Sequence, residues 1–150
     1  MASLAALAST AVATRLLGQS GVQSATRTVR DITVYKDPNC GCCTEWVKHL
    51  KKAGFTVTVR DTAEMETVKR SFGVPQALES CHTGRIGQYS IEGHVPADLI
   101  VKLVTEQPKG RGLAVPGMPM GSPGMEGSPK QAYDVLLFDA AGKTSVYAKR

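Results

Sequence analysis

The sequence predicts an α/β fold in a chain of 150 residues. Segments that alternate apolar and polar residues, as strands do, are followed by segments whose apolar residues recur at helical spacing. This β-α-β-α order is typical of a parallel strand pair covered by helices. The composition, with 42% hydrophobic and 21% charged residues, is that of a globular chain with a single core.

The first half of the expected domain contains two strands and two helices. The segment DITVY alternates like a short strand and leads directly into a cysteine-rich stretch. From Thr44 onward, Trp46, Val47 and Leu50 recur at helical spacing, and Gly54 supplies a stop. The expected ranges are strand 31–35, helix 44–54, strand 55–60 and helix 62–73.

The second half begins where Pro75 ends the second helix, because proline cannot continue a helix and restricts the residue before it. Pro96 opens a clear amphipathic helix. A Gly- and Pro-rich segment then indicates a long loop, and loops of that length in a compact domain are usually functional or disordered. The expected ranges are strands 77–83 and 87–93, helix 96–107, loop 108–130 and a C-terminal hairpin with strands 133–138 and 144–148.

Charge and apolar runs argue against two classes of partner. The net charge is +5, but Arg15, Arg27 and Arg30 precede every acidic residue, so the rest of the chain carries 15 of the 18 basic residues against 13 acidic ones. With 5% aromatic residues and no run that interleaves them with basic ones, no nucleic-acid surface is expected. No segment approaches the ~20 apolar residues that span a bilayer, so no membrane span is expected in the mature chain.

Residues 1–30 are rich in Ala, Ser and Thr and lack acidic residues, which indicates a targeting segment or a disordered tail. As an export signal the segment is weak or degenerate, because no Lys or Arg precedes its apolar stretch and Arg15 interrupts it. Small-residue patterns at 11–13 and 22–24 compete as cleavage sites. We expect an exported protein whose domain spans residues 31–150.

Three of the four cysteines lie within the stretch DPNCGCCTEW, at the junction of the first strand and helix. Cys40 and Cys43 form a C-x-x-C pair, and a helix N-terminus stabilises thiolates through its free N–H groups and its dipole. This geometry serves disulfide exchange or metal capture, and spacing alone does not separate the two.

The presence of Cys42 favours metal binding over disulfide exchange. An extra thiol beside a dithiol pair invites scrambled disulfides. Adjacent residues at a helix start project about 100° apart, so Cys42 and Cys43 suit different ions better than one compact tetrahedral ion. Several soft ions sharing sulfurs fit this arrangement, and Cu(I) prefers such ligands. Cys81 supplies the fourth sulfur if its strand lies beside the first strand; the alternative is a buried, inert cysteine.

Histidines and methionines add weaker signals. His82 adjoins Cys81 and is interpreted as a supporting hydrogen-bond partner or an occasional ligand, His49 as solvated, and His94 as structural. Met118, Met120 and Met125 fall together in the Gly/Pro loop, where their thioethers either contact copper or fill gaps beneath a lid.

The segments YKDPNCGCCTEWVKHLKKAGF, GVP, SCHTG, IEGHVPADLI and GLAVPGMPMGSPGME together resemble the CopG-like family of bacterial copper-resistance proteins, over residues 31–148. The family is distinct from the DNA-binding repressors of the same name. The resemblance implies a thioredoxin-like fold with a central mixed sheet flanked by helices. It also implies a copper cluster on Cys40, Cys42, Cys43 and Cys81, a periplasmic location among copper-handling proteins, and a cis peptide bond at Pro75.

The sequence therefore predicts a protein of copper tolerance that holds several Cu(I) ions on four thiolates, for sequestration, delivery or Cu(I)/Cu(II) interconversion. One alternative is a thiol-disulfide oxidoreductase, marked by a Cys40–Cys43 disulfide and by exchange activity that survives loss of Cys42 and Cys81. The other alternative is a structural zinc domain, which would hold one zinc ion and unfold without it.

Overall fold

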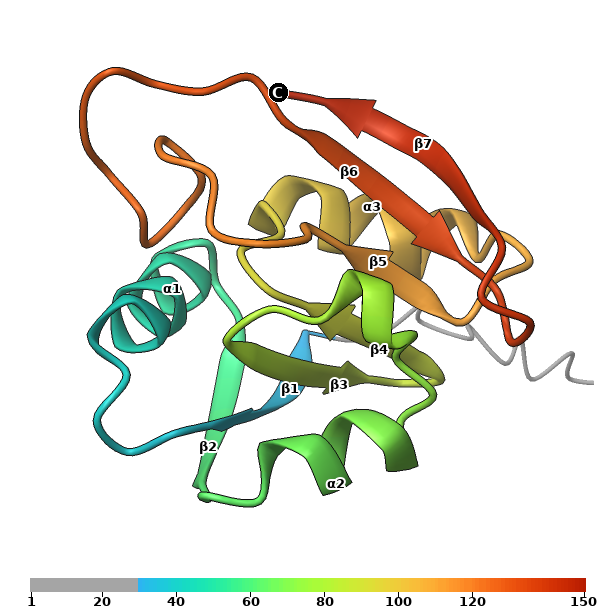
Figure 1. The fold of residues 1–150 in the computed structure, drawn as a ribbon, viewed down its shortest axis with the longest axis horizontal. Coiled ribbons are helices and arrows are strands. Elements are labelled where there is room, and N and C mark those ends of the chain that lie inside the picture. Colours follow the sequence, from blue (N-terminus) through green and yellow to red (C-terminus); the bar gives the residue numbers. More distant parts are fainter. Residues whose placement is uncertain (1–29) are drawn as a thin grey trace, which may run out of the picture.

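The computed structural model describes residues 30–150, which form a seven-stranded sheet with helices on both faces (Figure 1). The predicted targeting segment, residues 1–30, lies outside this range except for Arg30. The strands are β1 (Asp31–Lys36), β2 (Thr56–Asp61), β3 (His82–Ile86), β4 (Tyr89–Glu92), β5 (Gly112–Ala114), β6 (Asp134–Phe138) and β7 (Thr144–Lys149). The helices are α1 (Gly41–Lys52), α2 (Met65–Ser71), α3 (Ala97–Glu106) and a 3₁₀ turn, η1 (Gln76–Leu78).

The sheet is mixed, with strand order β2-β1-β3-β4-β5-β6-β7. β1 and β2 are parallel, as the β-α-β order predicts, and β3 lies antiparallel on the other side of β1. β4 pairs with β3 as a hairpin, β5 runs parallel to β4, and β6 and β7 close the sheet in antiparallel pairs. The predicted α/β class with a central mixed sheet and flanking helices is confirmed.

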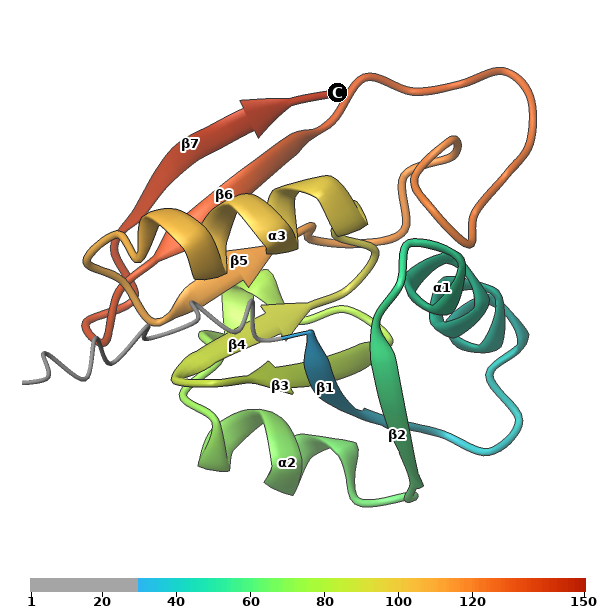
Figure 2. The same ribbon diagram turned by 180° about the vertical axis from the view of Figure 1, so that it is seen from behind.

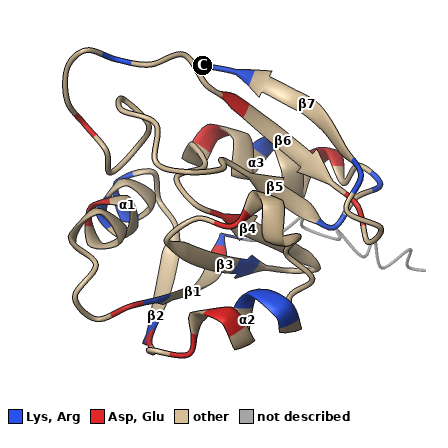
Figure 3. Ribbon diagram, in the orientation of Figure 1, with Lys and Arg blue, Asp and Glu red and all other residues tan. Residues whose placement is uncertain are grey.

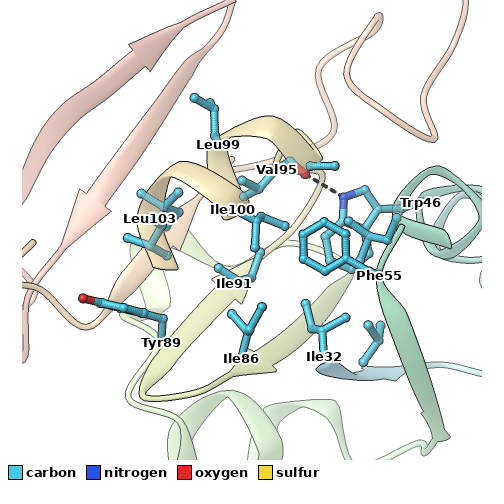
Figure 4. Close-up of a cluster of buried hydrophobic side chains, with 14 of the residues drawn as sticks. Ile32, Trp46, Phe55, Ile86, Tyr89, Ile91, Val95, Leu99, Ile100 and Leu103 are labelled. Atoms are coloured by element: carbon cyan, nitrogen blue, oxygen red, sulfur yellow. Dashed lines mark hydrogen bonds between the residues drawn. The ribbon is translucent and has the colours of Figure 1, made fainter. Parts of the chain in front are cut away.

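The main core lies between the sheet and the helices α1 and α3 (Figure 2). Trp46 from α1 is fully buried, and its indole N–H donates to the carbonyl oxygen of Val95 at 2.9 Å (Figure 4). Burial of a tryptophan is favourable through its large apolar ring, and its N–H usually finds an acceptor when the ring is buried. The same core contains apolar residues from the strands, from α3 and from the residue before β2, among them Ile32, Phe55, Ile86, Tyr89, Ile91, Leu99, Ile100 and Leu103 (Figure 4).

The opposite face is covered by α2 and η1 and has a smaller apolar cluster of Val74, Leu78, Ala114 and Phe138. Alternate residues of one strand serve the two faces: Leu113 belongs to the main core and Ala114 to the small cluster. All residues of β4 are buried because both faces of the sheet are covered at this strand. Ile91 lies on the main-core side.

β5 lies inside the segment predicted to be a single loop, so that prediction is wrong for Gly112–Ala114. Pairing with β4 on one side and β6 on the other holds these three residues extended. Gly112 permits the close approach, because a Cβ there would overlap the carbonyl oxygen of Ser90. A three-residue strand fixed entirely by its neighbours has no periodic signal of its own.

The expected strand 77–83 is also wrong in part, since its first residues belong to η1 and β3 begins only at His82. The backbone N–H of Ser80 donates to a carboxylate oxygen of Glu92 at 2.6 Å instead of joining a strand ladder. The remaining predicted elements are present, with shifted ends.

The expectation of a cis peptide bond at Pro75 is wrong. In the described part of the chain the cis bond is Ser128–Pro129. Pro75 precedes η1, and its carbonyl oxygen accepts the N–H of Leu78 at 2.8 Å. Cys81, not a proline, is the residue that directly precedes β3.

Within residues 30–150, the helices are too short or too polar to cross a membrane. Figure 3 shows both basic and acidic residues on α1 and on α2, which agrees with the near balance of charge in this part of the chain.

Candidate metal centre at the cysteine cluster

The turn between β1 and α1 fixes the first three cysteines. The carboxylate of Asp37 accepts the N–H of Asn39 at 2.7 Å, and its carbonyl oxygen accepts the N–H of Cys40 at 3.1 Å. Cys40 then caps α1, because its sulfur accepts the N–H of Cys43 at 3.3 Å. The helix therefore begins at Gly41, three residues before the predicted start, and contains Cys42 and Cys43 in its first turn.

The antiparallel pairing of β1 with β3 places Cys81 beside this turn. The last residue of β1, Lys36, pairs with the first residue of β3, His82, so the segments beyond them meet at one end of the sheet. Cys40, Cys42, Cys43 and Cys81, called here the four-cysteine cluster, have sulfurs within 4.8 Å of one another. The structure thus brings together all four cysteines that the sequence predicts to be metal ligands.

Two of the four sulfurs are joined: Cys40 and Cys43 form a disulfide, with their Cα atoms 5.4 Å apart. Cys42 and Cys81 are free thiols. The sulfur of Cys42 lies 3.5 Å from that of Cys40 and 3.9 Å from that of Cys81, so it stands between the disulfide and the fourth cysteine. Burial, together with the neighbouring Cys42, raises the pKa of the Cys81 thiol to about 12.

Two histidines contact Cys81. His82 Nδ1 lies 3.4 Å from the Cys81 sulfur, and His94 Nε2 lies 3.1 Å from it. Both rings are buried, and burial lowers the pKa of both imidazoles. His82 also stacks on the indole of Trp46, with ring centroids 4.3 Å apart. The prediction for His82 as a neighbour of the site agrees with this geometry.

His94 is a site residue that the sequence reasoning missed when it treated this histidine as structural. The hairpin register explains its place: Thr83 pairs with Glu92, so the residues just before β3 lie beside those just after β4. Continuing this register by two residues sets His94 opposite Cys81. A predicted hairpin register would therefore have identified His94 as a site residue.

His49, expected to be solvated, is partly buried instead. Its Nε2 accepts the backbone N–H of Ala97, the first residue of α3, at 3.1 Å. Pro96 has no side-chain acceptor to cap this helix, so His49 satisfies one of the free N–H groups of the first turn.

The Gly/Pro loop lies against α1 in both views (Figures 1 and 2), and Gly124 approaches the backbone carbonyl of Cys42. The hydroxyl of Ser80 donates to the carbonyl oxygen of Gly117 at 2.6 Å, and His94 Nδ1 donates to that of Pro123 at 2.8 Å. Of the loop methionines, Met118 is 53% exposed, whereas Met120 and Met125 are half-buried. Backbone carbonyls, rather than the methionine sulfurs, attach the loop to the residues around Cys81.

We expect Gly124→Ala to detach part of this loop from α1. A Cβ at Gly124, where φ is +86°, would lie 2.7 Å from the carbonyl oxygen of Cys42 and 2.8 Å from the backbone nitrogen of Trp46. Overlap with backbone atoms together with positive φ predicts a loss of about 1–3 kcal/mol in the free energy of unfolding. Urea denaturation and limited proteolysis of the loop measure it.

Gly117→Ala is the matched control for Gly124→Ala. Gly117 also has positive φ, +69°, but a Cβ there meets nothing within 4 Å. Gly117→Ala should therefore lower the free energy of unfolding only by the backbone strain, about 1 kcal/mol. Equal losses in the two variants would contradict tight packing of the loop on α1.

A buried ion pair supports the segment that contains Cys81. Lys69 from α2 pairs with Glu92, and both are almost fully buried. Glu92 also accepts the hydroxyl of Thr83 at 2.7 Å and the backbone N–H of Ser80. Burial raises the pKa of Glu92, and the Lys69 ammonium opposes that rise. The carboxylate thus fixes the backbone directly before Cys81.

The fold and this site define a mixed α/β protein with a cluster of four cysteines and two histidines at one end of its sheet. Residues 78–125, which include Cys81 and the loop, match a family described as "Protein of unknown function, DUF411". No curated protein sequence matches the chain.

Two solved structures, "Copper resistance protein copG- Form 1" and "Copper resistance protein copG- Form 2", are each 50% identical to this chain with a TM-score of 0.76. The match covers 80% of this chain and 96% and 97% of theirs, respectively. The chain belongs to the CopG-like copper-resistance family, as the sequence resemblance indicated.

Proposed function

We propose that this protein binds several Cu(I) ions through the thiolates of Cys40, Cys42, Cys43 and Cys81 and serves copper tolerance. The observation that carries the proposal is the convergence of four sulfurs within 4.8 Å at one end of the sheet. Thiolates select soft ions, Cu(I) foremost among the first-row metals. The names of the two 50% identical relatives support copper as the ion.

Binding through all four sulfurs requires the Cys40–Cys43 disulfide to be reduced, since the thiolate is the metal ligand. A dithiol reductant supplies the two electrons and two protons that convert the disulfide to two thiols and itself becomes a disulfide, and metal binding then releases protons. The N-terminus of α1 favours the resulting negative charge on Cys40 and Cys43 through its dipole and free N–H groups.

The number of ions distinguishes the proposal from a structural zinc site. Four bonds of about 2.3 Å to one tetrahedral ion set sulfurs about 3.8 Å apart. The separations of 3.5 and 3.9 Å around Cys42 fit that geometry and also fit sulfurs that bridge neighbouring copper ions. Counting the metal separates one zinc from several coppers.

We expect reduced protein, loaded anaerobically with Cu(I), to retain more than one copper per chain with all four thiols protected from alkylation. Elemental analysis and a thiol count on the same sample measure this. The matched control is protein whose thiols were alkylated before loading, which should retain none. A single retained zinc, with unfolding on its removal, would contradict the copper proposal, as would retention of no copper.

We further propose that the protein acts in the periplasm, with residues 1–30 as its export signal, and that residues 31–150 form a thioredoxin-like metal-binding domain. Cys40, Cys42 and Cys81 are partly exposed, which supports exchange of copper with other copper-handling proteins. Sequestration, delivery and Cu(I)/Cu(II) interconversion all use such an accessible site. Fractionation of cells and N-terminal sequencing of the mature chain test the location.

A second function, thiol-disulfide exchange, is favoured by one observation: the Cys40–Cys43 disulfide at the start of α1, with Cys40 partly exposed. The partner is then a protein dithiol, which becomes a disulfide as Cys40 and Cys43 become thiols. This candidate predicts disulfide exchange that persists in the Cys42→Ser and Cys81→Ser variants. Absence of exchange in the metal-free wild type would rule it out.

A further inference from the structure

We propose that Arg85 and Arg111, called here the arginine pair, bind a phosphate group on the face of the sheet opposite the main core. Arg85 lies in β3, and Arg111 directly precedes β5. Ser90 of β4 connects them, because it pairs with Arg85 and donates its backbone N–H to the carbonyl oxygen of Arg111 at 3.0 Å. Arg85 lies near the hairpin end of β3, whereas Cys81 directly precedes the other end. The arginine pair is therefore separate from the four-cysteine cluster.

A chain of hydrogen bonds holds the two arginine side chains together. One Nη of Arg85 donates to the hydroxyl oxygen of Ser90 at 3.3 Å, and that hydroxyl donates to the carbonyl oxygen of Phe72 at 2.9 Å. The Nε of Arg111 donates to the same carbonyl oxygen at 3.3 Å. Ser90 is fully buried, so the group that links the two side chains is held by the interior of the protein.

Each guanidinium is also held by a packing contact. The guanidinium of Arg85 lies over the ring of Phe72, 5.6 Å from its centroid, and this ring packs edge-on against that of Tyr35 at 5.3 Å. The guanidinium of Arg111 lies against the backbone of Gly73, where a Cβ would come within 3.1 Å of Nε. Because both side chains are ordered before a ligand arrives, binding costs little side-chain entropy.

The positive charge of the arginine pair is not balanced by acidic side chains. Among residues 30–150, neither guanidinium forms a salt bridge. Figure 3 shows further basic residues on the C-terminal part of α2, which packs against β3. Burial, together with the charge of Arg111, lowers the pKa of Arg85, as expected where two cations lie close together. An anion bound between the two guanidinium groups relieves this repulsion.

Most N–H donors of the arginine pair are not used within the protein. A guanidinium carries five N–H groups, and each of the two arginines uses one of them in a hydrogen bond within residues 30–150. Arg111 keeps both Nη groups, and Arg85 keeps its Nε and its other Nη, so each presents a fork of two donors. Such forks bind two oxygens of a phosphate or a carboxylate. Two cations match a phosphate group, with about two negative charges and three acceptor oxygens, better than a singly charged carboxylate.

The first test measures the binding of inorganic phosphate to the full metal-free chain at constant ionic strength. Calorimetry gives the affinity, and NMR follows the Nε–H signals of the arginines. We expect one phosphate per chain and shifts of the Arg85 and Arg111 signals on saturation. Arg85→Gln and Arg111→Gln should each weaken binding by about tenfold or more, because each removes a charged hydrogen-bonding partner. Phosphate binding that is as strong in both variants as in the wild type would overturn the proposal.

Arg60→Gln is the matched control for these two variants. It removes the same charge from β2, the strand at one edge of the sheet, where Arg60 is exposed. This variant should bind phosphate as the wild type does. A loss as large as that in Arg85→Gln would mean that net charge alone attracts phosphate, and it would overturn the proposal.

The test does not depend on Arg111→Gln, which loses the hydrogen bond to the end of α2 and could unfold. Circular dichroism verifies that each variant is folded. Arg85→Lys keeps the charge but lacks the fork, so it should weaken phosphate binding less than Arg85→Gln does. If Arg85→Gln is folded and binds phosphate as tightly as the wild type, the proposal is wrong.

The phosphate group can belong to a free ion or to a lipid headgroup, and a second probe distinguishes these sources. The protein is sedimented with vesicles of phosphatidylglycerol, and Arg85→Gln is compared with the wild type. Binding of inorganic phosphate without sedimentation identifies the free ion. Sedimentation that Arg85→Gln abolishes, without binding of inorganic phosphate, identifies the headgroup. If neither probe binds in a way that depends on the arginine pair, the proposal is overturned. Neither measurement involves copper, so this proposal and the proposed function fail independently.

Discussion

Cys42→Ser is expected to reduce the copper retained by the reduced protein from several ions per chain to one at most. The sulfur of Cys42 lies between those of Cys40 and Cys81, 3.5 and 3.9 Å away. Removing it takes away the sulfur that links the C-x-x-C pair to Cys81, and a hydroxyl is a poor ligand for a soft ion. Elemental analysis after anaerobic Cu(I) loading and gel filtration measures the loss.

Cys40→Ser is the comparison that separates copper binding from disulfide exchange. If the cluster binds copper, both variants lose most of their metal. If Cys40 and Cys43 act as an exchange pair, Cys40→Ser abolishes exchange and Cys42→Ser preserves it. Full copper retention in Cys42→Ser would contradict the proposed function.

The largest expected effect on stability comes from Lys69→Met, at about 3–5 kcal/mol in the free energy of unfolding. The substitution leaves the carboxylate of Glu92, which is 0% exposed, without its cationic partner. Breaking a buried ion pair from one side costs this much because the remaining charge is neither solvated nor paired. Urea denaturation at pH 7 measures the change.

The penalty of Lys69→Met should shrink as the pH falls. Burial already raises the pKa of Glu92 in the wild type above its usual 4.5, and loss of the ammonium raises it further. A raised folded pKa means that the native state binds the proton more tightly than the unfolded chain does. Protonation of Glu92 therefore contributes to the free energy of unfolding below pH 4.5, and this contribution is lost as the pH rises through the folded pKa. The variant should therefore differ less from the wild type at pH 4 than at pH 7.

Lys36→Met is the matched control. Lys36 is as buried as Lys69, but its partner Asp61, 3.1 Å away, is 53% exposed and stays hydrated when the lysine is removed. We expect a cost of about 1 kcal/mol or less from the lost ion pair and little dependence on pH between 4 and 7. Equal penalties for the two lysines would contradict the view that the buried carboxylate of Glu92 depends on Lys69 for its counter-charge.

Local patterns predicted most of the fold because they are set by near neighbours in the chain. The helical spacing of Trp46, Val47 and Leu50 predicted α1, and its buried face includes these residues. The β-α-β-α order predicted the parallel pairing of β1 and β2. The two errors in the assignment of elements, at β5 and at the segment before β3, concern residues whose backbone bonds go to partners far along the chain.

The residues of the candidate site also fall into two groups, those whose place the sequence predicted and those whose place depended on strand pairing. Cys40, Cys42 and Cys43 lie within four positions, so the sequence alone predicted that their sulfurs would gather at the start of α1. The expectation that Cys81 joins them depended on which strand lies beside β1, and the antiparallel pairing with β3 supplies that contact. His94 depended further on the register of β3 with β4 and on the carbonyl of Pro123 that orients its ring.

The sequence by itself determined most of the elements and which thiols are available, because propensity, spacing and side-chain chemistry are properties of short segments. Only the tertiary structure decided that Cys81 carries two imidazoles beside it, that Glu92 holds the backbone before it, and that the Gly/Pro loop lies over α1. Apart from the contact between the neighbours Cys81 and His82, these contacts join residues from 12 positions apart, for Ser80 and Glu92, to 82 positions apart, for Cys42 and Gly124. Their formation depends on strand order and register, which the burial of a whole core selects and no single segment encodes.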